Sequence, residues 1–84
     1  MERKVRLYTR EGCHLCREAG LALERLRDEF NLAIELVDID IDNGLRARYG
    51  NAIPVIVIDD SISFSAPIDE ARLRQALEDP EAHY

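Results

Sequence analysis

Glycine and proline are scarce in this sequence, with four glycines and three prolines among its 84 residues, and no segment repeats. This scarcity excludes long linkers and low-complexity regions. No apolar run approaches the roughly 20 residues that a membrane-spanning helix needs. The formal net charge of −6 leaves no basic excess for binding nucleic acid or an anionic membrane surface. We therefore expect a single domain over residues 1–84, with neither a nucleic-acid partner nor a membrane partner.

The beginning of the sequence lacks the features of a secretory signal peptide. Residues 1–6 are mostly charged and lead into no apolar segment of the kind that a signal peptide requires. The sequence therefore predicts a cytoplasmic protein.

Cysteine is also scarce, and the only two cysteines, Cys13 and Cys16, are spaced C-x-x-C. Such a bridge is a poor structural staple, because a disulfide stabilises mainly by closing a long loop of the unfolded chain. Small secreted domains usually carry several widely spaced pairs instead. In a chain with a βαβ pattern and no secretion signal, this spacing is typical of a redox motif.

Cys13 falls where a predicted strand meets a predicted helix. Residues 4–8 form the strand pattern, and the residues after Cys13 are apolar at three- and four-residue spacing, as in a helix packed on a sheet. The predicted apolar face consists of Leu15, Ala19, Ala22, Leu23, Leu26 and Phe30. Free N–H groups and the positive end of the helix dipole favour an anion at this junction. An anionic sulfur is the form of cysteine that attacks disulfides.

The remaining segments alternate between strand and helix patterns. Strands are predicted over residues 32–41, 54–58 and 62–64, and helices over residues 45–49 and 69–77. The resulting order, β-α-β-α-β-β-α, predicts an α/β fold in which a four-stranded mixed sheet carries helices on both faces. Its first βαβ unit should pair two strands in parallel.

Short breaking signals set the limits of these elements. Pro54 opens its strand, where a residue without an N–H is tolerated, and Pro67 suits the start of the last helix. Asp59-Asp60-Ser61 is typical of a hairpin turn. Asp79-Pro80 should stop the last helix, and residues 81–84 should form a loose tail.

Three alternating aspartates, Asp38, Asp40 and Asp42, end the second predicted strand. A calcium-binding loop would need glycine and glutamate where this chain has Asn43 and Tyr49. We therefore interpret the aspartates as a strand end followed by a helix N-cap. The chain also lacks a second Cys or His pair for structural zinc, so we expect no metal.

The element order, the C-x-x-C pair and Ile53-Pro54 before the third strand resemble the thioredoxin superfamily. Within it, the stretch YTREGCHLC at residues 8–16 is similar to the glutaredoxin pattern of tyrosine, a small polar residue, a basic residue and C-x-x-C. The chain departs from glutaredoxins in having His14-Leu15 between the cysteines. It also has Phe64-Ser65-Ala66-Pro67 in place of a glycine pair that helps to hold glutathione. Thioredoxins carry tryptophan before the first cysteine, and this chain has none.

The resemblance implies a thioredoxin fold and a cis peptide bond at Pro54, beside Cys13. It also implies that the backbone of Ile53 pairs with the extended chain of a substrate. Arg10 is a candidate for orienting an anionic substrate such as the glutathione carboxylate, and a solvated charge is the alternative.

Cys13 is the candidate nucleophile, and Cys16, one turn later, is the candidate resolving thiol. His14 is a further candidate, because a protonated imidazole beside Cys13 would stabilise its thiolate. The alternative is an exposed histidine without effect on the sulfur.

The resulting hypothesis is a dithiol–disulfide oxidoreductase that binds no cofactor and acts as a monomer. Its substrate would be a disulfide-containing protein or glutathione disulfide, and glutathione or a reductase would restore the dithiol. The alternative is a non-catalytic glutaredoxin-like binding module for a partner protein or an iron–sulfur cluster.

Overall fold

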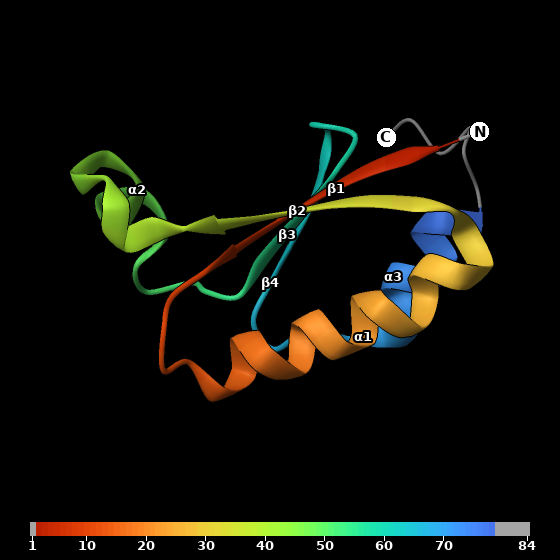
Figure 1. The fold of residues 1–84 in the computed structure, drawn as a ribbon, viewed down its shortest axis with the longest axis horizontal. Helices are drawn as coiled ribbons and strands as arrows, with labels where there is room; N and C mark the ends of the chain where they lie inside the picture. Colours follow the sequence, from red (N-terminus) through yellow and green to blue (C-terminus); the bar gives the residue numbers. More distant parts are fainter. Residues whose placement is uncertain (1, 79–84) are drawn as a thin grey trace.

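A four-stranded sheet with strand order β2-β1-β3-β4 organises the fold (Figure 1). The structure is a computed structural model and describes residues 2–78. Its strands and helices are β1 (Arg3–Thr9), α1 (His14–Phe30), β2 (Leu32–Asp38), η1 (Ile39–Ile41), α2 (Asn43–Tyr49), β3 (Val55–Ile58), β4 (Ile62–Ser65) and α3 (Glu70–Glu78). Strand β1 pairs in parallel with β2 and antiparallel with β3, which pairs antiparallel with β4. The predicted fold class is confirmed.

Helices α1 and α3 lie together on one face of the sheet (Figure 1). Strand residues of alternate parity face these helices, since successive side chains of a strand point to opposite faces. The buried cluster between the layers consists of Val5, Leu7, Ala19, Leu23, Leu26, Leu32, Ile56, Ile58, Leu73 and Leu77. This core fixes α1, and therefore the cysteines at its N-terminus, relative to the sheet.

The opposite face is covered by α2 near the end of the sheet at which β1 leads towards the cysteines. Tyr8, Ile39 and Val55 are buried there, with Leu45 and Tyr49 packed against them. The rings of Tyr8 and Tyr49 stack with their centroids 4.1 Å apart. Helices therefore lie on both faces of the sheet, as predicted.

The prediction of a second strand over residues 32–41 was wrong at its C-terminal end. Strand β2 stops at Asp38, whose side chain accepts a hydrogen bond from the Asp40 N–H at 2.9 Å and caps the short helix η1. The turn of η1 buries Ile39 completely in the second core cluster, while Ile41 remains exposed. Local capping and the burial of one isoleucine thus end the strand.

The start of the last helix also differs from the prediction. Pro67 lies outside α3, in a cis peptide bond with Ala66, and the helix begins at Glu70. The side chain of Asp69 accepts the Ala71 N–H at 2.9 Å, as expected of an N-cap. Asp69 therefore caps the helix, and Pro67 lies in the loop before it.

Within residues 2–78, no helix is both long enough and apolar enough to cross a membrane. The predicted stop at Asp79-Pro80 and the predicted tail over residues 81–84 lie outside the described residues.

Candidate active site

A tight turn places Cys13 at the start of α1. The Cys13 N–H donates to the Arg10 carbonyl oxygen at 3.3 Å. Gly12, inside this turn, has φ of 81°, a left-handed conformation that glycine adopts without a steric penalty. Cys13 itself is extended, with φ of −87° and ψ of 109°, and its carbonyl accepts the first helical hydrogen bond, from Arg17.

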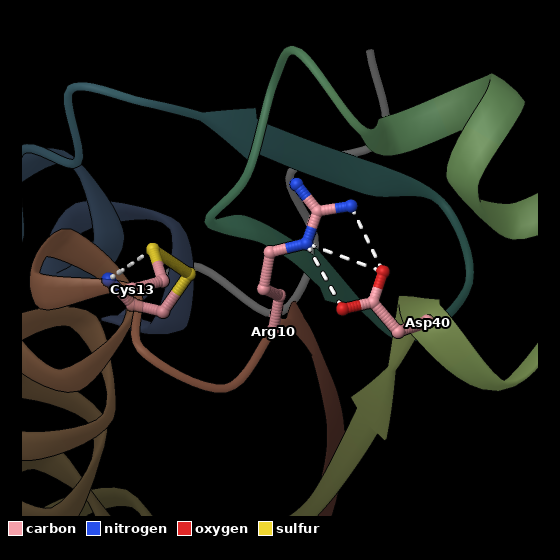
Figure 2. Close-up of a disulfide and its surroundings, with 4 residues drawn as sticks. Arg10, Cys13 and Asp40 are labelled. Carbon is pink, nitrogen blue, oxygen red and sulfur yellow. Dashed lines mark hydrogen bonds and ion pairs between the residues drawn. A yellow bond between two sulfur atoms is a disulfide. The ribbon is translucent and has the colours of Figure 1, made fainter.

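Cys13 and Cys16 form a disulfide across the first turn of α1, with their Cα atoms 5.2 Å apart. Figure 2 shows the Cys13 sulfur as the helix cap, accepting the Cys16 N–H at 3.1 Å. Cys13 is half-buried, whereas Cys16 is only 3% exposed. The two cysteines therefore differ in access, and the sulfur of Cys13 is the one that a bulky disulfide can approach.

Two cis-prolines border the disulfide-bearing end of α1 on the α3 side. The peptide bond Ile53-Pro54 is cis, as the resemblance implied, and so is Ala66-Pro67, which was not predicted. Pro54, Ala66 and Pro67 line a cavity of about 270 Å³ together with Leu15. A loop with a second cis-proline therefore occupies the position at which glutaredoxins have a glycine pair.

Leu15 was predicted to belong to the packed face of α1 but is 52% exposed. It lies between the two cysteines in the chain and lines this cavity with an exposed side chain.

The backbone of Ile53 is only partly available for a substrate. Its N–H donates to the Tyr49 carbonyl oxygen at 3.1 Å. Among the described residues, no hydrogen bond reaches the Ile53 carbonyl oxygen. The pairing of this backbone with an extended chain stays a prediction, and the carbonyl is the group that we expect to take part in it.

Arg10 is held by an internal carboxylate. Figure 2 shows its guanidinium turned to Asp40 of η1, with Nη2 at 2.9 Å and Nε at 3.1 and 3.2 Å from the carboxylate oxygens. This bidentate hydrogen bonding from Arg10 holds the pKa of Asp40 below its usual range. Arg10 and Asp40 form an exposed ion pair, so a substrate carboxylate would have to compete with Asp40, and the substrate role of Arg10 stays a prediction.

His14 is an exposed residue of the first turn. Its side chain is 77% exposed, and its Nε2 lies 3.7 Å from a carboxylate oxygen of Glu18, one turn further along α1. His14 is thus exposed, as the alternative proposed, and its effect on the Cys13 sulfur stays a prediction.

The contact between Arg10 and Asp40 was not predicted from the sequence, in which Asp38, Asp40 and Asp42 were interpreted as a strand end followed by a helix N-cap. A signal was present, because Arg10 follows β1, Asp40 follows β2, and these strands are parallel. The carboxyl ends of adjacent parallel strands meet at the same edge of a sheet. Asp42 was interpreted correctly: its side chain caps α2 by accepting the Gly44 and Leu45 N–H groups.

A sheet of this order, with C-x-x-C at the start of its first helix and a cis-proline before β3, defines a thioredoxin-like domain. Thioredoxin O2 from Arabidopsis thaliana in its oxidised state superposes with a TM-score of 0.71 over 93% of this chain and 74% of its own, at 22% identity. At that identity the likeness concerns the fold alone.

Sequence similarity identifies the family more narrowly. Residues 4–78 match the model of the glutaredoxin-like domain (DUF836), so the chain belongs to this family. A glutaredoxin-like protein from Dictyostelium discoideum is 35% identical over 80 residues, 88% of this chain and 74% of that protein. A solved protein from X. campestris is 36% identical, with a TM-score of 0.75 over 88% of this chain and 95% of its own.

Proposed function

We propose that the protein is a dithiol–disulfide oxidoreductase that reduces a disulfide of a partner protein through Cys13 and Cys16. The observation that carries this proposal is the unequal placement of the pair, with Cys13 half-buried at the helix N-cap and Cys16 buried behind it. In such a pair, the more accessible sulfur can react with the substrate while the other sulfur stays buried in the protein.

The reaction begins with the reduced pair. The Cys13 thiolate attacks one sulfur of the substrate disulfide, forms a mixed disulfide and expels the other substrate sulfur as a thiolate. The Cys16 thiolate then attacks the Cys13 sulfur, which releases the second substrate thiol and forms the Cys13–Cys16 disulfide. Two electrons pass from the protein to the substrate, and the resulting oxidised pair corresponds to the disulfide in the structure.

The N-terminus of α1 supports the role of Cys13 as the attacking sulfur. The Cys16 N–H already points at the Cys13 sulfur, and no acidic residue lies in the first turn of the helix. Hydrogen bonding and the helix dipole both favour the thiolate there.

The cycle needs an electron donor that returns the disulfide to the dithiol. We propose a protein reductase as this donor, because Asp40 competes with the carboxylates of glutathione for the guanidinium of Arg10. Such a cycle requires a reducing compartment, and we therefore place the protein in the cytoplasm.

A redox titration tests the proposal. The protein is equilibrated in glutathione buffers of graded potential, free thiols are alkylated, and the Cys13–Cys16 state is read by intact mass. We expect a two-electron midpoint between about −180 and about −270 mV, the range of disulfide isomerases and thioredoxins. A pair that stays reduced in oxidising buffer would refute the proposal and favour a non-catalytic binding module.

A further inference from the structure

A groove adjoins the disulfide on the side of α1 that faces β2. It encloses about 310 Å³ and includes Cys13 and Cys16 themselves in its lining. Leu7 lies at its buried base, and Gly20, Leu21 and Leu36 line it further from the cysteines. We call this feature the α1–β2 groove.

The apolar lining of the α1–β2 groove is unusually exposed. Leu21 is 50% exposed and Leu36 is 65% exposed, and both belong to the four large apolar side chains that remain exposed among residues 2–78. Leu21 belongs to α1 and Leu36 to β2, and both line the α1–β2 groove.

Gly20 indicates that the groove is kept open. Glycine is unfavourable inside a helix relative to alanine. A Cβ atom at Gly20 would meet only Leu7, at an ordinary contact distance of 3.9 Å, so nothing inside the protein requires glycine here. An absent side chain on the wall of a groove allows another chain to approach closely.

The outer edge of the α1–β2 groove is the edge of β2 that does not pair with β1. β2 is an edge strand of the sheet, and it runs for seven residues with only Glu35 and Asp38 charged. Natural edge strands are usually protected by charge, proline or brevity. A long apolar edge offers backbone N–H and C=O groups to an extended peptide, which is a common mode of peptide recognition.

The charged side chains along the groove indicate which charges a bound peptide would carry. Arg17 lines the end near the cysteines and Glu24 lines the distal end. Neither side chain belongs to an ion pair within the part of the chain that the structure describes. A complementary peptide would carry an acidic residue beside its cysteine and a basic residue beyond its apolar anchor.

We infer that the α1–β2 groove docks an extended segment of the protein substrate, with an apolar side chain seated between Leu21 and Leu36. This inference rests on the proposed function, since the docked segment carries the cysteine that Cys13 attacks. Leu21 lies eight positions after Cys13 along α1, a rise of about 12 Å. An extended peptide spans that distance in about four residues, so the anchor lies about four positions from the reacting cysteine.

Synthetic peptides test the inference in single turnovers of the pre-reduced protein. Each probe carries a cysteine joined to nitrothiobenzoate as a mixed disulfide, a glutamate beside it, a leucine four positions away and then a lysine, in either chain direction. Reaction reduces the mixed disulfide to the peptide thiol and coloured thionitrobenzoate, while Cys13 and Cys16 become a disulfide. We expect the leucine probe to react about tenfold faster than its serine version, as expected for one buried leucine-sized contact.

Variants assign that preference to the groove. In Leu36→Glu and Leu21→Glu, the leucine probe and its serine version should react at rates within about twofold of each other. Ile41→Glu is the matched control, because Ile41 is equally apolar, 78% exposed and outside the groove; it should retain the preference. Exchanging glutamate and lysine in the probe should slow the wild-type reaction, and added salt should reduce that difference.

A small neutral disulfide, bis(2-hydroxyethyl) disulfide, separates the two proposals. All variants should reduce it at the wild-type rate, and failure of the wild type itself would refute the proposed function. Wild-type protein that reduces it but shows no leucine preference would overturn the docking inference alone. A dimer in light scattering that Leu36→Glu dissociates, with unchanged peptide rates, would assign the groove to a second copy of the chain and would also overturn the inference.

Discussion

At the scale of single residues, the fold makes two chemically identical cysteines unequal. Cys13 caps α1 at the surface, and Cys16 lies one turn inside the helix with 3% of its surface exposed. In the proposed reaction, a substrate sulfur therefore forms the mixed disulfide with Cys13, and Cys16 is the thiol that would resolve it.

Replacing the resolving thiol should arrest the cycle at the mixed disulfide. We expect Cys16→Ser to accumulate an adduct of Cys13 with a substrate peptide, detected as an added mass in non-reducing mass spectrometry and removed by dithiothreitol. Cys13→Ser is the matched control and should form little adduct, because its remaining thiol is buried. An adduct that formed mainly in the Cys13→Ser protein would reverse the assignment of the two roles.

Asp40 is the residue that we expect to disfavour anionic substrates, because its carboxylate occupies Arg10. Asp40→Asn removes the competing charge and should raise the rate with glutathione disulfide, relative to neutral bis(2-hydroxyethyl) disulfide. Since exposed ion pairs contribute at most about 1 kcal/mol, the rise should not exceed about fivefold. Stopped-flow oxidation of the pre-reduced protein measures both rates.

The control for Asp40→Asn is Glu35→Gln, which removes an equal charge from an ion pair with Arg6. It should leave the ratio of the two rates unchanged. Because Arg10 holds the pKa of Asp40 below its usual range, the carboxylate stays ionised at the pH at which thiols react. The effect of Asp40→Asn should therefore be constant from about pH 6 to about pH 9, and a rise that also appeared with Glu35→Gln would point to net charge alone.

At the scale of elements, helix α1 is less stable with Gly20 than it would be with alanine at this position. Gly20→Ala should raise the free energy of unfolding by about 0.5–1 kcal/mol, because alanine has the higher helix propensity and its Cβ meets only Leu7 at 3.9 Å. Urea unfolding followed by circular dichroism measures the change.

Gly50, which follows α2, gives the opposite expectation and serves as the control. A Cβ atom there would lie 2.5 Å from the carbonyl oxygen of Arg46, so Gly50→Ala should destabilise the protein. Loss of stability in Gly20→Ala would show that the space beside Leu7 is needed by the protein's own packing, and would remove one support for the α1–β2 groove.

Elements with strong local signals were predictable from the sequence. Apolar spacing identified α1, and the turn at Asp59-Asp60 identified the β3–β4 hairpin, in which both aspartates adopt positive φ. The end of β2 was not predictable from periodicity, because Ile39 and Ile41 continue the apolar pattern while the Asp38 cap redirects the backbone. Where alternation and capping compete, burial of Ile39 in the second core decides the outcome.

At the scale of the whole molecule, the candidate site depends on residues that the sheet brings together from distant parts of the chain. Arg10 contacts Asp40 because β1 and β2 run in parallel. Leu21 of α1 and Leu36 of β2 line the same groove. The C-x-x-C pair was evident from the sequence, since both cysteines share one helical turn. The surfaces around this pair were not evident from the sequence, because each depends on the register between two strands or on the packing of a strand against α1.

The whole fold should persist when the disulfide is reduced. The main core packs α1 and α3 on the sheet without a contribution from either cysteine. The bond closes a loop with a sequence separation of only three residues, for which the chain-entropy model gives about 2 kcal/mol. We therefore expect dithiothreitol to lower the free energy of unfolding by no more than about 2 kcal/mol, measured by urea titration of both forms, with Cys13→Ser as the reference that cannot form the bond. A reduced protein that unfolds in buffer would show that the bond serves as a staple, whereas a folded dithiol form is what a pair that cycles between two redox states requires.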